Sequence, residues 1–161
     1  MATVMDSTPT TQVYRVFIQA TPEAVWDAIT KPDWNERFGY RCRQEFELRP
    51  GGAYRGYANE QMLATGGSEI VVDGEVVECD PPHKLVQTWR ASWTGEGFTK
   101  LTYEIAQGLG GVTSLTLVHE LEGAPGTAAQ VAGAIEGAGG GWAEVLSDLK
   151  TLLETGKPLY I

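Results

Sequence analysis

The sequence predicts an α+β protein in which a curved antiparallel sheet of about seven strands surrounds one long C-terminal helix, with two short helices after the first strand. The strongest observation is residues 139–156, whose apolar side chains recur at the spacing of one helix face. Most other segments are rich in β-branched and aromatic residues, as strands are. Short turns join the later strands, and strands joined in this way pair antiparallel.

The C-terminal helix is defined by an apolar stripe of six residues: Trp142, Val145, Leu146, Leu149, Leu152 and Leu153. Four charged residues fall off this stripe: Glu144, Asp148, Lys150 and Glu154. Gly156 and Pro158 follow as helix stop signals. Such a stripe has to be buried, and in a chain made mostly of strands the surface that buries it is a sheet.

The two short helices are predicted from their start signals. Residues 13–20 are rich in β-formers and predict the first strand. Thr21 followed by Pro22 is typical of a helix N-cap and first helical position. Pro32 ends this helix, and a second helical turn is expected over residues 33–38.

The middle of the chain predicts strands joined by turns. Pro-Gly-Gly at residues 50–52 predicts a hairpin turn between two strands. Residues 59–67 are small and polar and predict a mobile loop. The remaining Ala/Gly-rich segment, residues 124–138, is expected to begin the last helix early, with glycines 139–141 as a weak joint. The strands are expected over residues 45–49, 53–57, 69–79, 84–93, 98–106 and 112–121.

Composition and charge limit the classes of function that the protein can have. A chain of 161 residues, 42% hydrophobic and 20% charged, predicts one globular domain over residues 13–161, after a flexible tail at residues 1–12. A net charge of −9 without a Lys/Arg cluster argues against a nucleic-acid partner. No apolar run is long enough for membrane insertion, and the N-terminus lacks the features of a secretory signal.

The cysteines and histidines are few and scattered. Cys42 and Cys79 are interpreted as reduced thiols, which predicts a cytoplasmic protein. His83 and His119 have no clustered ligand residues near them, so no metal and no cofactor is expected. The sequence also contains no nucleophile elbow and no phosphate-binding loop.

Four segments in this order resemble one protein superfamily. They are residues 21–30 (TPEAVWDAIT), 49–52 (RPGG), 74–89 (GEVVECDPPHKLVQTW) and the pair Gly141-Trp142. Together they resemble the START-like or SRPBCC superfamily of helix-grip proteins, and within it the group related to the activator of Hsp90 ATPase. The resemblance implies a cavity for a hydrophobic or amphipathic small molecule between the sheet and the C-terminal helix. In related groups this cavity serves lipid binding, polyketide cyclisation or stress response. The resemblance carries no shared catalytic set, so no catalytic residue is assigned.

The chain departs from that resemblance in its Ala/Gly-rich stretch, residues 123–141, where relatives carry larger side chains. Two interpretations are open. Small residues there could widen or loosen the mouth of the cavity, or they could only loosen the start of the last helix. The second interpretation is the simpler one.

Strand alternation places His119 on the inward face together with Leu115, Leu117 and Leu121. Tyr103 is placed inward on the preceding strand by the same argument. The two could form one polar spot in an apolar pocket, with His119 orienting a ligand or acting in acid–base chemistry. The alternative, which we prefer, is a histidine that is hydrogen-bonded within the core.

Large aromatic residues lie in elements that are expected to meet, and aromatic side chains often line cavities. Trp89 is the better lining candidate, whereas Trp142 fits an ordinary core position equally well. The predicted lining residues of the cavity are Trp26, Trp89, Tyr103, Leu117, His119 and Trp142.

The sequence therefore favours a protein that binds a hydrophobic small molecule. The first alternative is a cyclase-like or hydrolase-like enzyme that uses the same cavity, with His119 and Tyr103 as acid–base groups. The second is a protein-interaction module that resembles an Hsp90 co-chaperone. A homodimer is compatible with all three.

Overall fold

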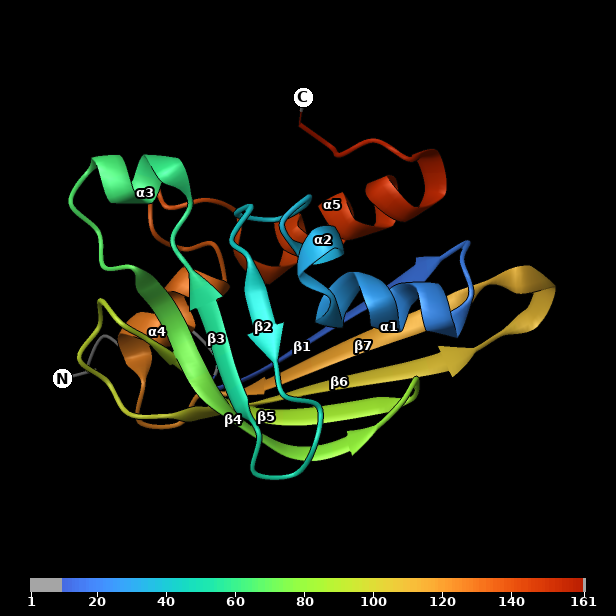
Figure 1. Ribbon diagram of the computed structural model, residues 1–161, viewed down its shortest axis with the longest axis horizontal. Helices are drawn as coiled ribbons and strands as arrows, with labels where there is room; N and C mark the ends of the chain where they lie inside the picture. The colour runs from blue at the N-terminus through green and yellow to red at the C-terminus, as the bar shows by residue number, and fades with distance from the viewer. Residues whose placement is uncertain (1–9, 161) are drawn as a thin grey trace, which may run out of the picture.

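The architecture was examined in a computed structural model, which describes residues 10–160. One antiparallel sheet contains seven strands in the order β1-β7-β6-β5-β4-β3-β2. The sheet is curved, and helices α1, α2 and α5 lie on the same side of it (Figure 1). The predicted helix-grip fold is thus confirmed. The strands are β1 Thr11–Ile18, β2 Gln44–Phe46, β3 Ala53–Tyr57, β4 Ile70–Asp80, β5 Lys84–Ala91, β6 Thr99–Gln107 and β7 Thr113–Glu120.

Two short helices follow the first strand, as predicted. The hydroxyl of Thr21 accepts a hydrogen bond from the amide of Ala24 at 3.1 Å, which is the expected N-cap contact. The Pro-Gly-Gly turn joins β2 to β3, which pair antiparallel. The helices are α1 Pro22–Thr30, α2 Pro32–Asn35, α3 Glu60–Ala64, α4 Pro125–Val131 and α5 Gly141–Thr155, with a short 3-10 turn over Leu109–Gly111.

Helix α5 packs its apolar stripe into the core. Leu146, Leu149 and Leu152 are buried, and the other three stripe residues, Trp142, Val145 and Leu153, are partly buried against the same core. The helix ends at Gly156, whose φ of 81° lies in the left-handed region and whose amide donates to the carbonyl of Leu152 at 2.8 Å. No helix within residues 10–160 is long and apolar enough to cross a membrane.

Asp148 is buried although it falls off the apolar stripe of the helix. Its Oδ2 accepts from the amide of Gly39 at 2.8 Å and its Oδ1 from the amide of Leu159 at 2.7 Å. A buried carboxylate needs such donors, because it would otherwise lose its hydration without compensation. Asp148 therefore ties the loop after α2 and the C-terminal segment to the helix, a tertiary role that helical periodicity does not report.

The predictions for two further segments are also corrected. Residues 59–67 contain α3, which the Asn59 side chain caps by accepting from the amide of Met62 at 2.8 Å. The five residues of α3 are too few to show a helical period, so the sequence indicated only a loop. The Ala/Gly-rich segment does not run into α5 either: it forms the separate helix α4, followed by a turn in which Gly133, Gly137 and Gly139 have positive φ.

The predicted N-terminal tail, residues 1–12, falls largely outside the described residues. Its last two residues, Thr11 and Gln12, belong to strand β1. Gln12 is buried, and its Nε2 donates to the carbonyl of Ala128 at 3.0 Å, which joins β1 to α4. A polar residue can extend a strand when its side chain finds a buried partner, which composition alone cannot show.

We expect Leu149→Ala to destabilise the protein by about 2–5 kcal/mol, because Leu149 is 1% exposed and its truncation leaves a cavity beneath α5. Denaturant unfolding of both proteins measures this difference. The matched control is Leu109→Ala, since Leu109 is 94% exposed and should change stability by less than about 0.5 kcal/mol. An equally small effect of Leu149→Ala would contradict the described packing of α5.

Candidate functional site

A cavity of about 500 Å³ opens between the N-terminal end of α5, the α4–α5 turn, α3 and strands β3 to β5. Among the residues that the structure describes, no lining side chain is a Lys, Arg, His, Asp or Glu. Aromatic side chains make up much of the wall: Phe38, Tyr40, Tyr54, Trp89, Trp93 and Trp142. The cavity is therefore largely apolar, as small-molecule sites usually are.

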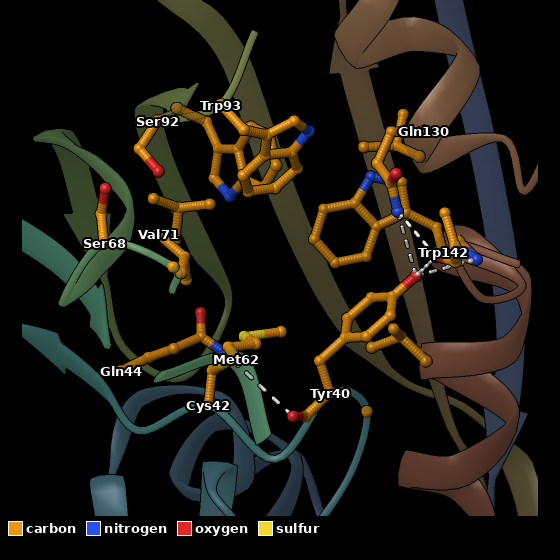
Figure 2. Close-up of a pocket in the computed structure, with 18 of the residues that line it drawn as sticks. Tyr40, Cys42, Gln44, Met62, Ser68, Val71, Ser92, Trp93, Gln130 and Trp142 are labelled. Atoms are coloured by element: carbon orange, nitrogen blue, oxygen red, sulfur yellow. Dashed lines mark hydrogen bonds between the residues drawn. The ribbon is translucent and has the colours of Figure 1, made fainter. Parts of the chain in front are cut away.

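A few uncharged polar groups interrupt the apolar wall. Figure 2 shows Tyr40, Gln130 and Trp142 on one side of the cavity, facing Ser68, Val71 and Ser92 on the other. The Oε1 atom of Gln44 is already used, because it accepts from the hydroxyl of Tyr54 at 2.7 Å. The remaining hydroxyl and amide groups could orient a ligand that carries hydrogen-bonding groups of its own.

A chain of hydrogen bonds fixes the wall formed by Trp89 and Trp142. The indole Nε1 of Trp142 donates to Nδ1 of His119 at 3.0 Å, and Nε2 of His119 lies 2.7 Å from Oγ1 of Thr99. Thr99 in turn donates to the carbonyl of Trp89 at 2.7 Å. An indole N–H can only donate, so Nδ1 is the acceptor and the imidazole carries its hydrogen on Nε2.

His119 is consequently a neutral, fully buried group. Burial lowers its pKa to about 3, because the charged imidazolium would lose its hydration. The rings of Trp89 and His119 meet edge to face with centroids 5.3 Å apart, and the Trp89 and Trp142 centroids are 6.2 Å apart. His119 thus contacts both aromatic rings and uses both of its ring nitrogens in hydrogen bonds.

Of the six predicted lining residues, Trp89 and Trp142 line the cavity. The other four lie in the adjoining core rather than on the cavity wall: Trp26, Tyr103, Leu117 and His119. Strand alternation identified their inward direction, but the inner face of the sheet is longer than the cavity. Helices α1 and α5 cover its remaining part, and side chains there are core.

The predicted polar spot of Tyr103 and His119 is not formed among the described residues. Tyr103 lies opposite Leu117 across the β6–β7 pair, whereas His119 lies opposite Leu101. His119 uses both ring nitrogens on Thr99 and Trp142. Burial also raises the pKa of the Tyr103 phenol far above its usual range, so this group stays protonated.

Sequence reasoning missed Tyr40, which spans the cavity mouth. Its hydroxyl donates to the carbonyl of Ala138 at 3.2 Å and lies 3.4 Å from both Nε2 of Gln130 and the amide of Gly141 (Figure 2). A Cβ atom on Gly139 would come within 2.7 Å of the Tyr40 ring. The glycine run near residue 139 is the signal that could have indicated this close approach.

Two sulfur atoms lie on the cavity wall near Tyr40. Sγ of Cys42 is 3.7 Å from Sδ of Met62, and burial raises the pKa of the Cys42 thiol. A protonated, partly buried thiol of this kind packs as a small apolar group. Within residues 10–160, no group of three or more His, Cys, Asp or Glu side chains is placed to hold a metal ion.

The sequence matches the family described as Activator of Hsp90 ATPase homolog 1-like protein over residues 19–154, which is most of the chain. The chain belongs to this family. The match begins at the end of β1 and continues almost to the end of α5, so it includes every element that surrounds the cavity. A comparison with curated proteins gives no match.

Solved structures of other proteins share the fold. The solution structure of CalU16 from Micromonospora echinospora is 21% identical, with a TM-score of 0.65 over 92% of this chain and 68% of CalU16. PFC0360w, an HSP90 activator from Plasmodium falciparum, is 20% identical, with a TM-score of 0.63 over 89% of this chain and 95% of that one. The DynU16 crystal structure, from the dynemicin biosynthetic locus, is 21% identical with a TM-score of 0.69 over 93% of this chain.

The chain spans only part of some of these relatives: 49% of DynU16, and 59% of CalU16 in its crystal structure. At these identities the likeness establishes the fold alone. The family membership of the chain agrees with the resemblance that its sequence motifs indicated.

His119 should make stability depend on pH. Its folded pKa of about 3 lies below the unfolded value near 6.5, so the unfolded chain takes up the proton first as pH falls. The contribution of the neutral His119 to the free energy of unfolding is complete above pH 6.5 and is lost progressively toward pH 3. Between pH 6.5 and 5 we expect a loss of roughly 2 kcal/mol of unfolding free energy.

Urea unfolding across this range, compared with that of His119→Gln, measures the effect. The variant should lose this part of the pH dependence. His83→Gln is the matched control, because His83 is exposed in a turn and should leave the profile of the parent protein unchanged. Parallel profiles for the parent and His119→Gln would rule out a buried neutral imidazole.

Proposed function

We propose that the protein binds a hydrophobic or amphipathic small molecule in the cavity between the sheet and α5. One observation carries the proposal: a cavity of about 500 Å³ with six aromatic residues and no charged side chain on its described wall. This volume lies within the range of about 300–1,000 Å³ that is typical of small-molecule sites. The side chains of the protein do not fill this space.

The affinity would come mainly from apolar area removed from water. Each Å² contributes about 25 cal/mol before the cost of association is subtracted. A ligand that fills only part of such a cavity is expected to bind in about the micromolar range. Hydroxyl and amide groups of Ser68, Ser92 and Gln130 would orient it without adding much affinity.

The comparisons bear on the ligand only through the fold. DynU16 comes from a locus for the biosynthesis of dynemicin, and this chain has the same fold. Binding of a small molecule is a role in which the aromatic cavity of this chain would be used directly. A sequence identity of 21% supports a shared fold but not a shared ligand. The proposed class of ligand is therefore argued from the cavity itself.

An acid–base enzyme is less well supported. His119 is neutral, hydrogen-bonded at both nitrogens and separated from the cavity by Trp142. Tyr103 lies in the core and keeps its proton. A catalytic acid or base has to come within hydrogen-bonding distance of its substrate, and neither group lines the cavity.

The likeness to PFC0360w, an HSP90 activator, favours a second candidate function, that of a co-chaperone-like interaction module. Stimulation of the ATPase activity of an Hsp90 by the purified protein would test it. The aromatic cavity has no evident use in that role, so ligand binding remains the better supported function.

We expect Nile red, a neutral environment-sensitive dye, to bind the folded protein saturably with a dissociation constant in about the micromolar range. Trp89→Arg should abolish this binding, because it removes an aromatic wall and places a charge in the apolar space. Dye fluorescence titrations measure binding, and thermal unfolding tests whether the variant retains a cooperative transition.

Ser68→Trp offers a second variant that fills the cavity from an exposed loop, and it should also weaken dye binding. Leu109→Arg, remote from the cavity and highly exposed, should leave binding unchanged. If the dye does not saturate, the cavity is not the binding site. The same follows if it binds the parent protein and the Trp89→Arg, Ser68→Trp and Leu109→Arg variants equally. Either result would make the interaction module the better supported function.

A further inference from the structure

We propose that the cavity selects lipophilic cations, such as alkyl- or arylammonium compounds, over neutral and anionic molecules of the same shape. This inference rests on the proposed function and specifies its ligand. Two independent features carry it: the aromatic residues on the cavity wall, and the charges of residues that neighbour the lining residues in sequence.

The indole of Trp142 turns its N–H group away from the cavity. This N–H donates to Nδ1 of His119, which is not a lining residue. The N–H is the most positive part of an indole, so this bond leaves the carbon rings of Trp142 to form the wall. Figure 2 shows the six-membered ring of Trp142 directed into the open space.

Aromatic rings attract cations through the negative charge on their faces, and tryptophan does so best. The cavity brings together three tryptophans and two tyrosines: Trp89, Trp93, Trp142, Tyr40 and Tyr54. Such a wall can hold an ammonium group whose alkyl substituents are themselves apolar. A carboxylate or sulfate would have to give up its hydration and would find no basic side chain on the described wall.

Acidic residues without an ion-pair partner lie close in sequence to lining residues of the cavity. Glu69 follows the lining residue Ser68, Glu60 is two residues before Met62, and Glu136 is two residues before Ala138. All three are exposed, and none takes part in an ion pair within residues 10–160. Their charges are part of the net charge of −9, which attracts a cation toward the protein.

Three arginines that neighbour lining residues in sequence have hydrogen-bond or ion-pair partners among the described residues. Arg41 donates to the carbonyl of Tyr160 at 2.8 Å. Arg43 forms an ion pair with Glu45, and Arg90 forms one with Asp73 at 2.9 Å. Arg90 follows the lining residue Trp89 on β5, so strand alternation turns it to the opposite face. Two of these arginines are thus compensated by a carboxylate, and the described wall of the cavity has no charged side chain.

The test uses three molecules with the same ten-carbon chain and different head groups: decyltrimethylammonium, decanol and decanoate. Each competes with Nile red for the protein at neutral pH and low salt. We expect decyltrimethylammonium to displace the dye at a concentration about five- to thirtyfold lower than decanol, as a partly desolvated cation–π contact allows. Decanoate should be the weakest competitor.

Two variants separate the contributions of ring and charge. Trp93→Leu should reduce the preference for the cation, and the fold should survive because Trp93 is 54% exposed in a loop. The double variant Glu69→Gln with Glu136→Gln should reduce the preference and its salt dependence. Glu23→Gln, which lies in the first turn of α1, is the matched control and should change neither.

The outcomes distinguish this inference from the proposed function. Saturable dye binding with decanoate as the best competitor would overturn the preference for cations and leave the binding function intact. An unchanged cation-to-decanol ratio in both Trp93→Leu and the double variant would overturn it as well. Failure of the dye itself to bind would instead reject the proposed function on which the inference rests.

Discussion

The structure depends on the contact between the apolar stripe of α5 and the concave face of the sheet. At the C-terminal part of the helix this contact is dense, because Leu149 and Leu152 are almost fully buried. At its N-terminal end the helix presents Trp142 instead, which is only partly buried. One straight helix cannot follow a curved sheet along its whole length, so the space at this end is left as the cavity.

The Trp142–His119 hydrogen bond joins the two layers at the boundary between core and cavity. It links α5 to β7, and through Thr99 it reaches the carbonyl of Trp89 on β5. Every polar group in this chain of contacts is satisfied, which is the condition for keeping a polar network in a core. A histidine that looked suited to chemistry therefore serves to position the aromatic wall.

The glycine-rich turn between α4 and α5 completes the opposite wall. Tyr40 contacts this turn through its hydroxyl, and Gly139 provides the space that the ring requires. The small residues of this turn thus allow a specific contact with Tyr40 across the cavity.

The sequence by itself determined the features that depend on local spacing. The period of α5, the N-cap of α1 at Thr21, the turn between β2 and β3 and the inward direction of His119 all follow from neighbours along the chain. These signals were sufficient for the fold, and for Trp89 and Trp142 as cavity residues. Each depends on the repeat of a helix or strand, which is fixed by backbone geometry.

Only the tertiary structure decided which inward side chains face the cavity and which are core. Tyr103 and Leu117 share the inner face with Trp89, but the helices cover them, and alternation cannot report what lies above a strand. The burial of Asp148 and the contact of Tyr40 with residue 138 were equally hidden, because their partners are distant in sequence. Local spacing determines the direction of a side chain, whereas packing between layers determines what it meets.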